Sequence, residues 1–171
     1  MSKYFIRRAT VSDAATIAGH RVAMFSDMGQ VPTKALADRL LAESTSTLSD
    51  LLRDGSYVGW LAIDANDRVI AGAGAHIKPQ LPRISQDGRH VAVGSVPLVV
   101  NVYTDPNWRR QGIARALMKE LMEWALASGY DRILLHASDD GRPLYVSLGF
   151  LPTTEMRWTP TNCGQGDHTE Q

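Results

Sequence analysis

The chain has 171 residues, of which 44% are hydrophobic and 21% are charged, and its 18 basic and 18 acidic residues cancel to zero formal charge. This composition is typical of one soluble globular domain with a substantial core. It excludes the broad basic surface through which many proteins bind nucleic acid. The sequence contains no apolar run of ~18 residues, the length needed to span a bilayer, and its first residues lack a signal-type apolar segment. The single cysteine, Cys163, cannot form an internal disulfide. We therefore expect a cytoplasmic protein with neither nucleic-acid nor membrane partners.

Hydrophobic periodicity and turn residues divide the chain into the strands and helices of one α+β domain. The first half is expected to hold a strand at 3–10, a helix from Thr10 or Ser12 to 28–29, a helix at 33–44, a short helix ending at Gly55, and a hairpin of strands 56–64 and 68–78. The second half is expected to hold a polar loop at 79–90, a buried central strand at 91–104, a helix at 112–128, a strand at 131–138, a short helix at 142–149 and a last strand at 155–160. Without a repeat or a second core, these elements predict one domain over 1–160 and a disordered tail over 161–171.

The segment NVYTDPNWRRQGIARALM, residues 101–118, places two arginines at the start of a helix. Positive charge is disfavoured there, because the helix dipole already contributes about half a positive charge and the first N–H groups lack partners. A bound pyrophosphate would reverse the conflict and make Arg109 and Arg110 favourable partners. The small residues Gly112 and Ala114 would let the phosphate approach the backbone. The alternative is that the arginines are solvated loop residues and the glycine serves a turn.

Arg109-x-x-Gly112-x-Ala114 resembles the Q/R-x-x-G-x-G/A signature of the GNAT superfamily, the acyl-CoA-dependent N-acetyltransferases. Upstream, LVVNVYT at 98–104 resembles the splayed strand of that family. Downstream, SDDGRPLYVSLGF at 138–150 resembles its N-x-x-A-x-x-L-Y-x-x-x-G-F element. The resemblance covers about residues 3–158 and implies a GNAT-like fold, in which helices flank a twisted, mixed, mostly antiparallel sheet with a splayed central strand.

The same resemblance implies acetyl-CoA as cosubstrate, its pyrophosphate on the signature and its pantetheine arm along the splayed strand. Two positions depart from the family pattern, since Ser138 and Gly141 stand where relatives carry asparagine and alanine. Metal chemistry is unsupported, because five scattered histidines and one cysteine give no ligand spacing. The residues expected at the coenzyme are Val102, Tyr103, Thr104, Arg109, Arg110, Gln111, Gly112, Ile113, Ala114, Arg115, Ser138, Gly141 and Tyr145.

Acyl transfer from a thioester to an amine needs a polarised carbonyl, a neutral amine and a proton for the departing thiolate. A backbone N–H near Val102 or Tyr103 can polarise the carbonyl. The resemblance places Tyr145 beside the sulfur as general acid, and its alternative role is an amphipathic core residue. Some relatives carry a glutamate base eleven residues before the signature arginine, but here that position is Leu98. No side-chain base follows from the motifs.

The acceptor is expected to be a primary amine on a small molecule or a peptide. His76 and His136 could relay a proton through water, although a structural role is preferred for both. Arg21, Phe25 and Met28 could contact the acceptor, with core packing or a surface salt bridge as the alternatives. Dimerisation is common in the family, so a homodimer is an option. The competing function is a non-catalytic acyl-CoA-binding or regulatory domain.

Overall fold

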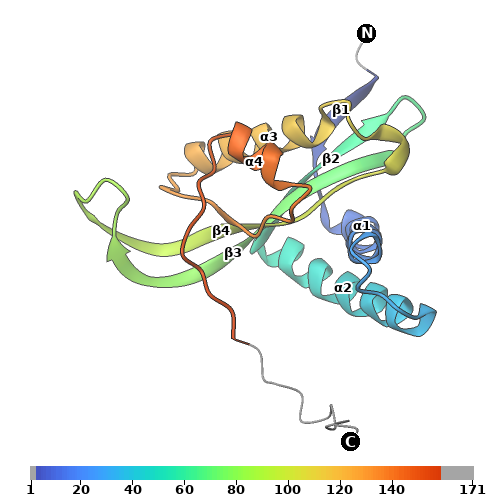
Figure 1. Cartoon of the computed structure of the whole chain (residues 1–171), viewed down its shortest axis with the longest axis horizontal. Helices are drawn as coiled ribbons and strands as arrows, with labels where there is room; N and C mark the ends of the chain where they lie inside the picture. The colour runs from blue at the N-terminus through green and yellow to red at the C-terminus, as the bar shows by residue number, and fades with distance from the viewer. Residues whose placement is uncertain (1–2, 159–171) are drawn as a thin grey trace, which may run out of the picture.

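The structure is a computed structural model that describes residues 3–158 (Figure 1). The tail that we expected to be disordered, 161–171, lies outside the described residues. Within the described range, no helix is both long and apolar enough to cross a membrane. In chain order the elements are β1 (Tyr4–Arg8), the 3-10 helix η1 (Val11–Asp13), α1 (Ala14–Asp27), α2 (Lys34–Asp54), β2 (Tyr57–Asp64), β3 (Val69–Ile84), β4 (Val91–Thr104), the 3-10 helix η2 (Pro106–Trp108), α3 (Ile113–Ala127), β5 (Leu134–Leu135) and α4 (Arg142–Ser147).

The five strands form one sheet in the order β1-β2-β3-β4-β5. Each neighbouring pair is antiparallel except β4 and β5, which run parallel. Helices cover both faces, with α1 and α2 on one side and α3 and α4 on the other (Figure 1). The prediction of one α+β domain with a mixed, mostly antiparallel sheet is therefore confirmed.

Two apolar clusters hold these three layers together. On the α3 face, Ile113, Leu117 and Leu121 pack with residues of β2, β3 and β4. On the opposite face, Ile17 of α1 and Leu48 of α2 pack in a second cluster with residues of β2. The recurrence of apolar side chains every three to four residues explains why α3 lies flat on the sheet. The sheet is thus buried on both faces along β2, in which every residue is buried, and along the first half of β3.

β4 separates from β5 close to its middle. The two strands pair only at Leu98 with Leu134 and at Val99 with Leu135. Beyond Val99, the edge of β4 that faces β5 is left open down to Thr104. This opening is the splay that the family resemblance implies.

A β-bulge in β4 lies at the point where the splay begins. Gly74 of β3 pairs with Val100, and Gly72 pairs with Tyr103, so β4 has one more residue than β3 between the two pairs. Asn101, inside the bulge, has a φ of 59°. A bulge bends its strand and increases the local twist. The bulge begins directly after the last residues of β4 that pair with β5.

Two boundaries in the first half differ from the sequence prediction. The expected break after residue 44 is absent, and α2 continues as one helix to Asp54. The Thr45 hydroxyl donates to the carbonyl of Leu41 at 2.7 Å, so this polar residue bonds within the helix instead of ending it. The polar loop expected at 79–90 is wrong over its first half, because β3 continues to Ile84 and pairs with the start of β4 as a two-stranded arm, and only 85–90 form the closing turn.

Two boundaries near the C-terminus differ as well. The strand expected at 131–138 is reduced to the two residues of β5. The last strand, expected at 155–160, is not formed over 155–158, where Met156 and Trp158 expose 94% and 83% of their surface. So short a β5 offers few backbone groups for a sixth strand to pair with.

Candidate active site

The start of α3 presents a row of free backbone donors. Within the part of the chain that the structure describes, the N–H groups of residues 110–115 donate to no protein acceptor. Two left-handed residues shape this turn, Arg110 with φ 62° and Gly112 with φ 80°. Consecutive N–H groups on such a turn form a concave anion site, and the helix dipole adds to it. Residues 109–115, which are most of the predicted coenzyme contacts, therefore lie on one turn whose geometry suits an anion.

Arg109 is fixed by contacts within the chain. Its Nε donates to the carbonyl of Thr104 at 3.0 Å, and its guanidinium forms an ion pair with Asp27 at the end of α1. The hydrogen bond that Arg109 donates to Asp27 raises the pKa of Arg109. Asp27 thus neutralises part of the positive charge that the sequence placed at the helix start. Arg109 thereby links the end of β4 to the end of α1, and both Arg109 and Arg110 are exposed to solvent.

The loop before α4 gathers the other predicted coenzyme residues. The Ser138 hydroxyl accepts a hydrogen bond from the Gly141 N–H at 3.2 Å. A Cβ on Gly141 would lie 3.0 Å from the Tyr145 ring, so the glycine allows this ring to approach the loop. Burial raises the pKa of Tyr145, and the phenol is therefore protonated at neutral pH.

A hydrogen bond joins α4 to the start of α3. Arg115, in the first turn of α3, donates to the Ser147 hydroxyl of α4 at 2.7 Å. Tyr145 packs against the cluster that contains Val99 and Ile113, and its ring meets Phe150 edge-on at 6.0 Å. The predicted acid thus lies on an element that is hydrogen-bonded to the start of α3 and packed on the core under α3.

The predicted residues at the end of β4 face different sides of the sheet. Val102 packs against the cluster under α3. Tyr103 points to the α1 face, where its ring lies 5.0 Å from the ring of His20. Burial lowers the pKa of His20, so this histidine is neutral at pH 7. Tyr103 and His20 form an aromatic wall on the α1 side of the splayed strand.

The predicted acceptor residues on α1 do not behave alike. Arg21 donates through Nη1 to Oδ1 of Asn101 at 2.8 Å, and its guanidinium lies 4.8 Å from the centre of the Phe25 ring. Among the described residues it has no carboxylate partner. Met28, just beyond the helix end, exposes 42% of its surface. Arg21 and Phe25 are therefore together near β4, whereas Met28 faces solvent.

Two histidines belong to the strands on either side of Leu98 or follow directly after them. His76 of β3 is the direct cross-strand neighbour of Leu98, and burial lowers its pKa. His136 follows β5, and its Nδ1 lies 3.5 Å from a carboxylate oxygen of Glu155. The structure therefore places His76 beside the position that holds a glutamate in some relatives. Its role as a proton relay, like that of His136, stays a prediction.

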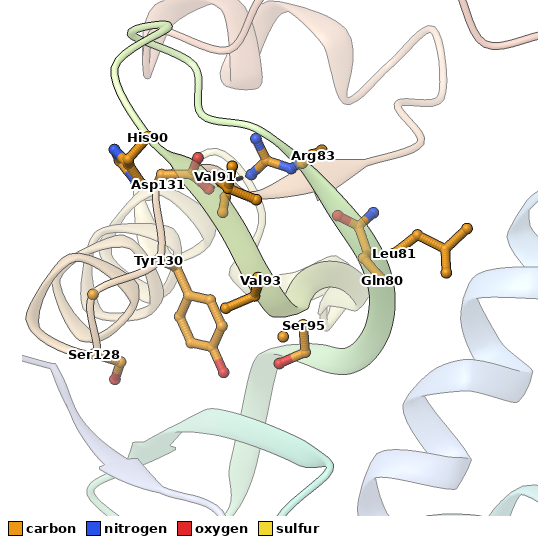
Figure 2. Close-up of a pocket in the computed structure, with 13 residues that line it drawn as sticks. Gln80, Leu81, Arg83, His90, Val91, Val93, Ser95, Ser128, Tyr130 and Asp131 are labelled. Atoms are coloured by element: carbon orange, nitrogen blue, oxygen red, sulfur yellow. Dashed lines mark hydrogen bonds and ion pairs between the residues drawn. The ribbon is translucent and has the colours of Figure 1, made fainter.

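Two hollows of the surface are lined by residues outside the turn at 109–115. One, of about 420 Å³, is enclosed by the β3–β4 arm and the loop after α3, where Arg83 pairs with Asp131 beside Tyr130 (Figure 2). The other, of about 750 Å³, lies along α3 and the segment after α4. The first hollow is at the C-terminal end of α3, and a helix of that length places it about 20 Å from Gly112. We therefore locate the site from the open strand and the free N–H groups.

Three functional candidates were missed by sequence reasoning. Asn101 is 6% exposed in the bulge, Tyr57 is buried beside it, and Asp27 holds Arg109. The available signal was an asparagine inside an otherwise β-branched run. No group of three or more His, Cys, Asp or Glu among the residues described here could hold a metal ion.

Comparison with known proteins gives a consistent result. Residues 24–150 match the model of the acetyltransferase (GNAT) family. A glucosamine 6-phosphate N-acetyltransferase from Trypanosoma brucei brucei is 34% identical over 83 residues, which are 48% of this chain and 51% of that enzyme. The match thus spans about half the length of this curated relative.

Two solved structures resemble the chain over almost its whole length. A GCN5-related N-acetyltransferase from Ralstonia eutropha JMP134 has a TM-score of 0.80 and 29% identity, with 92% of this chain and 98% of that chain covered. An acetyltransferase from Clostridium acetobutylicum, solved with acetyl-CoA, has a TM-score of 0.75 and 27% identity, with 93% and 96% covered.

Proposed function

The chain belongs to the GNAT acetyltransferase family, and on that premise we propose that it transfers the acetyl group of acetyl-CoA to a primary amine. The acceptor is a small molecule or a peptide, and the amine attacks directly while both substrates are bound. A cytoplasmic location and a homodimeric state remain predictions that accompany this proposal.

The observation that carries the proposal is the free backbone turn at 110–115. N–H groups without a protein acceptor, at the positive end of a helix, favour a doubly charged ligand such as a pyrophosphate. The open space beside Gly112, where a Cβ would meet no heavy atom within 4 Å, supports the close approach of a phosphate. The similar structure solved with acetyl-CoA agrees with a coenzyme ligand.

The chemistry follows from the elements around the opening of β4. The amine nitrogen bonds to the thioester carbonyl carbon, and a backbone N–H of the splayed strand near Val102 stabilises the developing oxyanion. The C–S bond then breaks, and the thiolate takes the proton of the Tyr145 phenol. The amine releases its proton to water, and the phenolate of Tyr145 then takes a proton from water. The raised pKa of Tyr145 is consistent with a group that holds its proton until a thiolate forms.

The acceptor pocket is proposed to lie on the α1 side of the splayed strand. Arg21, Phe25 and Tyr103 approach this side, and Arg21 carries a charge without a carboxylate partner among the described residues. The relative that acts on glucosamine 6-phosphate makes amino sugars and their phosphates a first choice of acceptor to test. Polyamines, aminoglycosides, amino acids and peptide N-termini complete the panel.

The alternative is a domain that binds acyl-CoA without transferring the acyl group. Calorimetry with acetyl-CoA, combined with measurement of free thiol across the amine panel, separates the two functions. Thiol release that depends on an amine supports the enzyme. Tight binding without thiol release on any amine supports the regulatory domain.

A further inference from the structure

We propose that Asn101 is a positioning residue that fixes the opening of β4 by binding Arg21 and Tyr57. The proposal rests on the acetyl transfer proposed above and deepens it, because this opening would hold the thioester. Asn101 is not itself placed among the reacting groups. It acts through the backbone that follows it, residues 102–104.

The backbone of Asn101 is unusual for a buried strand. Its φ of 59° lies in the left-handed region, which asparagine tolerates better than most residues. Its side chain is almost fully buried, at 6% exposure for the residue. A buried amide without hydrogen bonds would cost about 1–3 kcal/mol. The conformation therefore persists because partners hold the side chain.

Two partners from different elements satisfy that side chain. Oδ1 accepts from Nη1 of Arg21 in α1 at 2.8 Å, across 80 residues of sequence. The amide also hydrogen-bonds the phenol of Tyr57 in β2. Burial raises the pKa of Tyr57 to about 12, and the bond to Asn101 opposes that rise. The bulge is thus tied to a helix and to a second strand.

Gly74 provides the space in which Tyr57 reaches Asn101. A Cβ at position 74 would lie 2.1 Å from the Tyr57 hydroxyl oxygen and 2.8 Å from the backbone oxygen of Val58. Gly74 is also the β3 residue paired with Val100, immediately before the bulge. The phenol therefore lies over the β3–β4 ladder at the point where the register shifts.

The bulge that holds Asn101 lies directly before the open segment of β4, residues 102–104. Val99 is the last β4 residue paired with β5, and Asn101 follows two residues later. Without the bonds of Asn101, the open segment 102–104 is held by its ladder with β3 and by Arg109 at Thr104. The free N–H turn at 110–115 does not depend on these bonds. Loss of the network should misplace the reacting carbonyl while leaving the coenzyme bound.

The test uses Asn101→Gly, which tolerates the left-handed backbone and removes both side-chain bonds. Asn101→Asp keeps an oxygen for Arg21 and serves as the rescue variant. The matched control is Asp67→Gly in the turn between β2 and β3, because Asp67 also has a φ of 59° and is exposed. For each protein, turnover, acetyl-CoA dissociation constant and amide hydrogen exchange of residues 100–104 are measured.

Asn101→Gly should lower kcat by about tenfold or more, keep the acetyl-CoA dissociation constant within about threefold, and speed exchange at 102–104. Asn101→Asp should recover most of the rate, and Asp67→Gly should match the parent protein. Unchanged kcat and unchanged exchange in Asn101→Gly would overturn the proposal, as would equal losses of kcat and coenzyme affinity. Exchange is measured without substrates, so it decides the role of Asn101 even if the parent protein acetylates no amine.

Discussion

Gly112 allows the coenzyme site to be tested with an internal control. Its φ is 80°, and a Cβ there would meet no heavy atom within 4 Å. Gly129, after the other end of α3, has a φ of 79° and equally open surroundings. Replacing either glycine by leucine therefore adds left-handed backbone strain without a clash. The two variants differ in only one relevant respect, their distance from the free N–H turn.

The expected magnitudes follow from that comparison. Left-handed strain costs about 1–2 kcal/mol for a residue with a side chain, so both variants should lose this much free energy of unfolding. Gly112→Leu should also lose hydrogen bonds to the pyrophosphate, each worth about 1.5–3 kcal/mol to a charged group. Since 1.4 kcal/mol is a factor of about ten, one lost bond weakens acetyl-CoA binding by about tenfold to a hundredfold.

The assay is chemical denaturation for both variants, followed by calorimetry with acetyl-CoA on the folded proteins. Equal loss of stability with weakened binding in Gly112→Leu alone is the expected result. Equal acetyl-CoA affinity in the two leucine variants would refute the assignment of the pyrophosphate to the start of α3.

Three further predictions concern the acid, an ion pair and the packing of the bulge. Tyr145→Phe should lower kcat by about 10²-fold with nearly unchanged acetyl-CoA affinity, and an unchanged kcat in steady-state kinetics would remove the phenol from the mechanism. Arg7 donates hydrogen bonds to Asp13 and lowers the pKa of that carboxyl from 3.8 to about 2. The stabilisation by this ion pair is therefore complete above about pH 4 and is lost as the pH falls toward about 2. Asp13→Asn should therefore lower the free energy of unfolding by about 1–2 kcal/mol at pH 7, allowing for the exposure of the arginine. A difference in free energy of unfolding between variant and parent that stays constant from pH 7 down to pH 2 would contradict this. Gly74→Ala should lower the free energy of unfolding by about 3 kcal/mol or more, because the new Cβ overlaps Tyr57. The control is Gly59→Ala, whose Cβ would lie 3.1 Å from its nearest neighbour, and it should lose less. Equal melting temperatures for the two variants would show that the Tyr57 ring moves aside freely.

Much of the fold could be predicted from sequence because it depends on local periodicity. The apolar stripe of α3 predicts a helix, and the β-branched run of β4 predicts a strand. The helix start at Gly112 was visible because its charges contradict a local rule, and such contradictions often mark function. The structure adds that Asp27, distant in sequence, resolves part of the contradiction within the chain.

The remainder depends on contacts between distant residues, which periodicity does not show. The serine- and threonine-rich stretch near Thr45 suggested a helix break, but a hydroxyl can bond within its own helix. Two prolines favour a loop at 79–90, but both lie within β3, where an edge position leaves the missing N–H of proline without a required partner. The hydrogen bonds of Asn101 join α1, β2 and β4, and no residue spacing along the chain predicts these contacts.

The central claim is that this chain moves an acetyl group from acetyl-CoA to an amine. The most direct measurement incubates the protein with acetyl-CoA and each member of the amine panel, and quantifies free thiol and acetylated amine together by absorbance and mass spectrometry. We predict that at least one amine is acetylated in equal amount to the thiol released. Tight binding of acetyl-CoA with no acetylated amine across the panel would contradict the account.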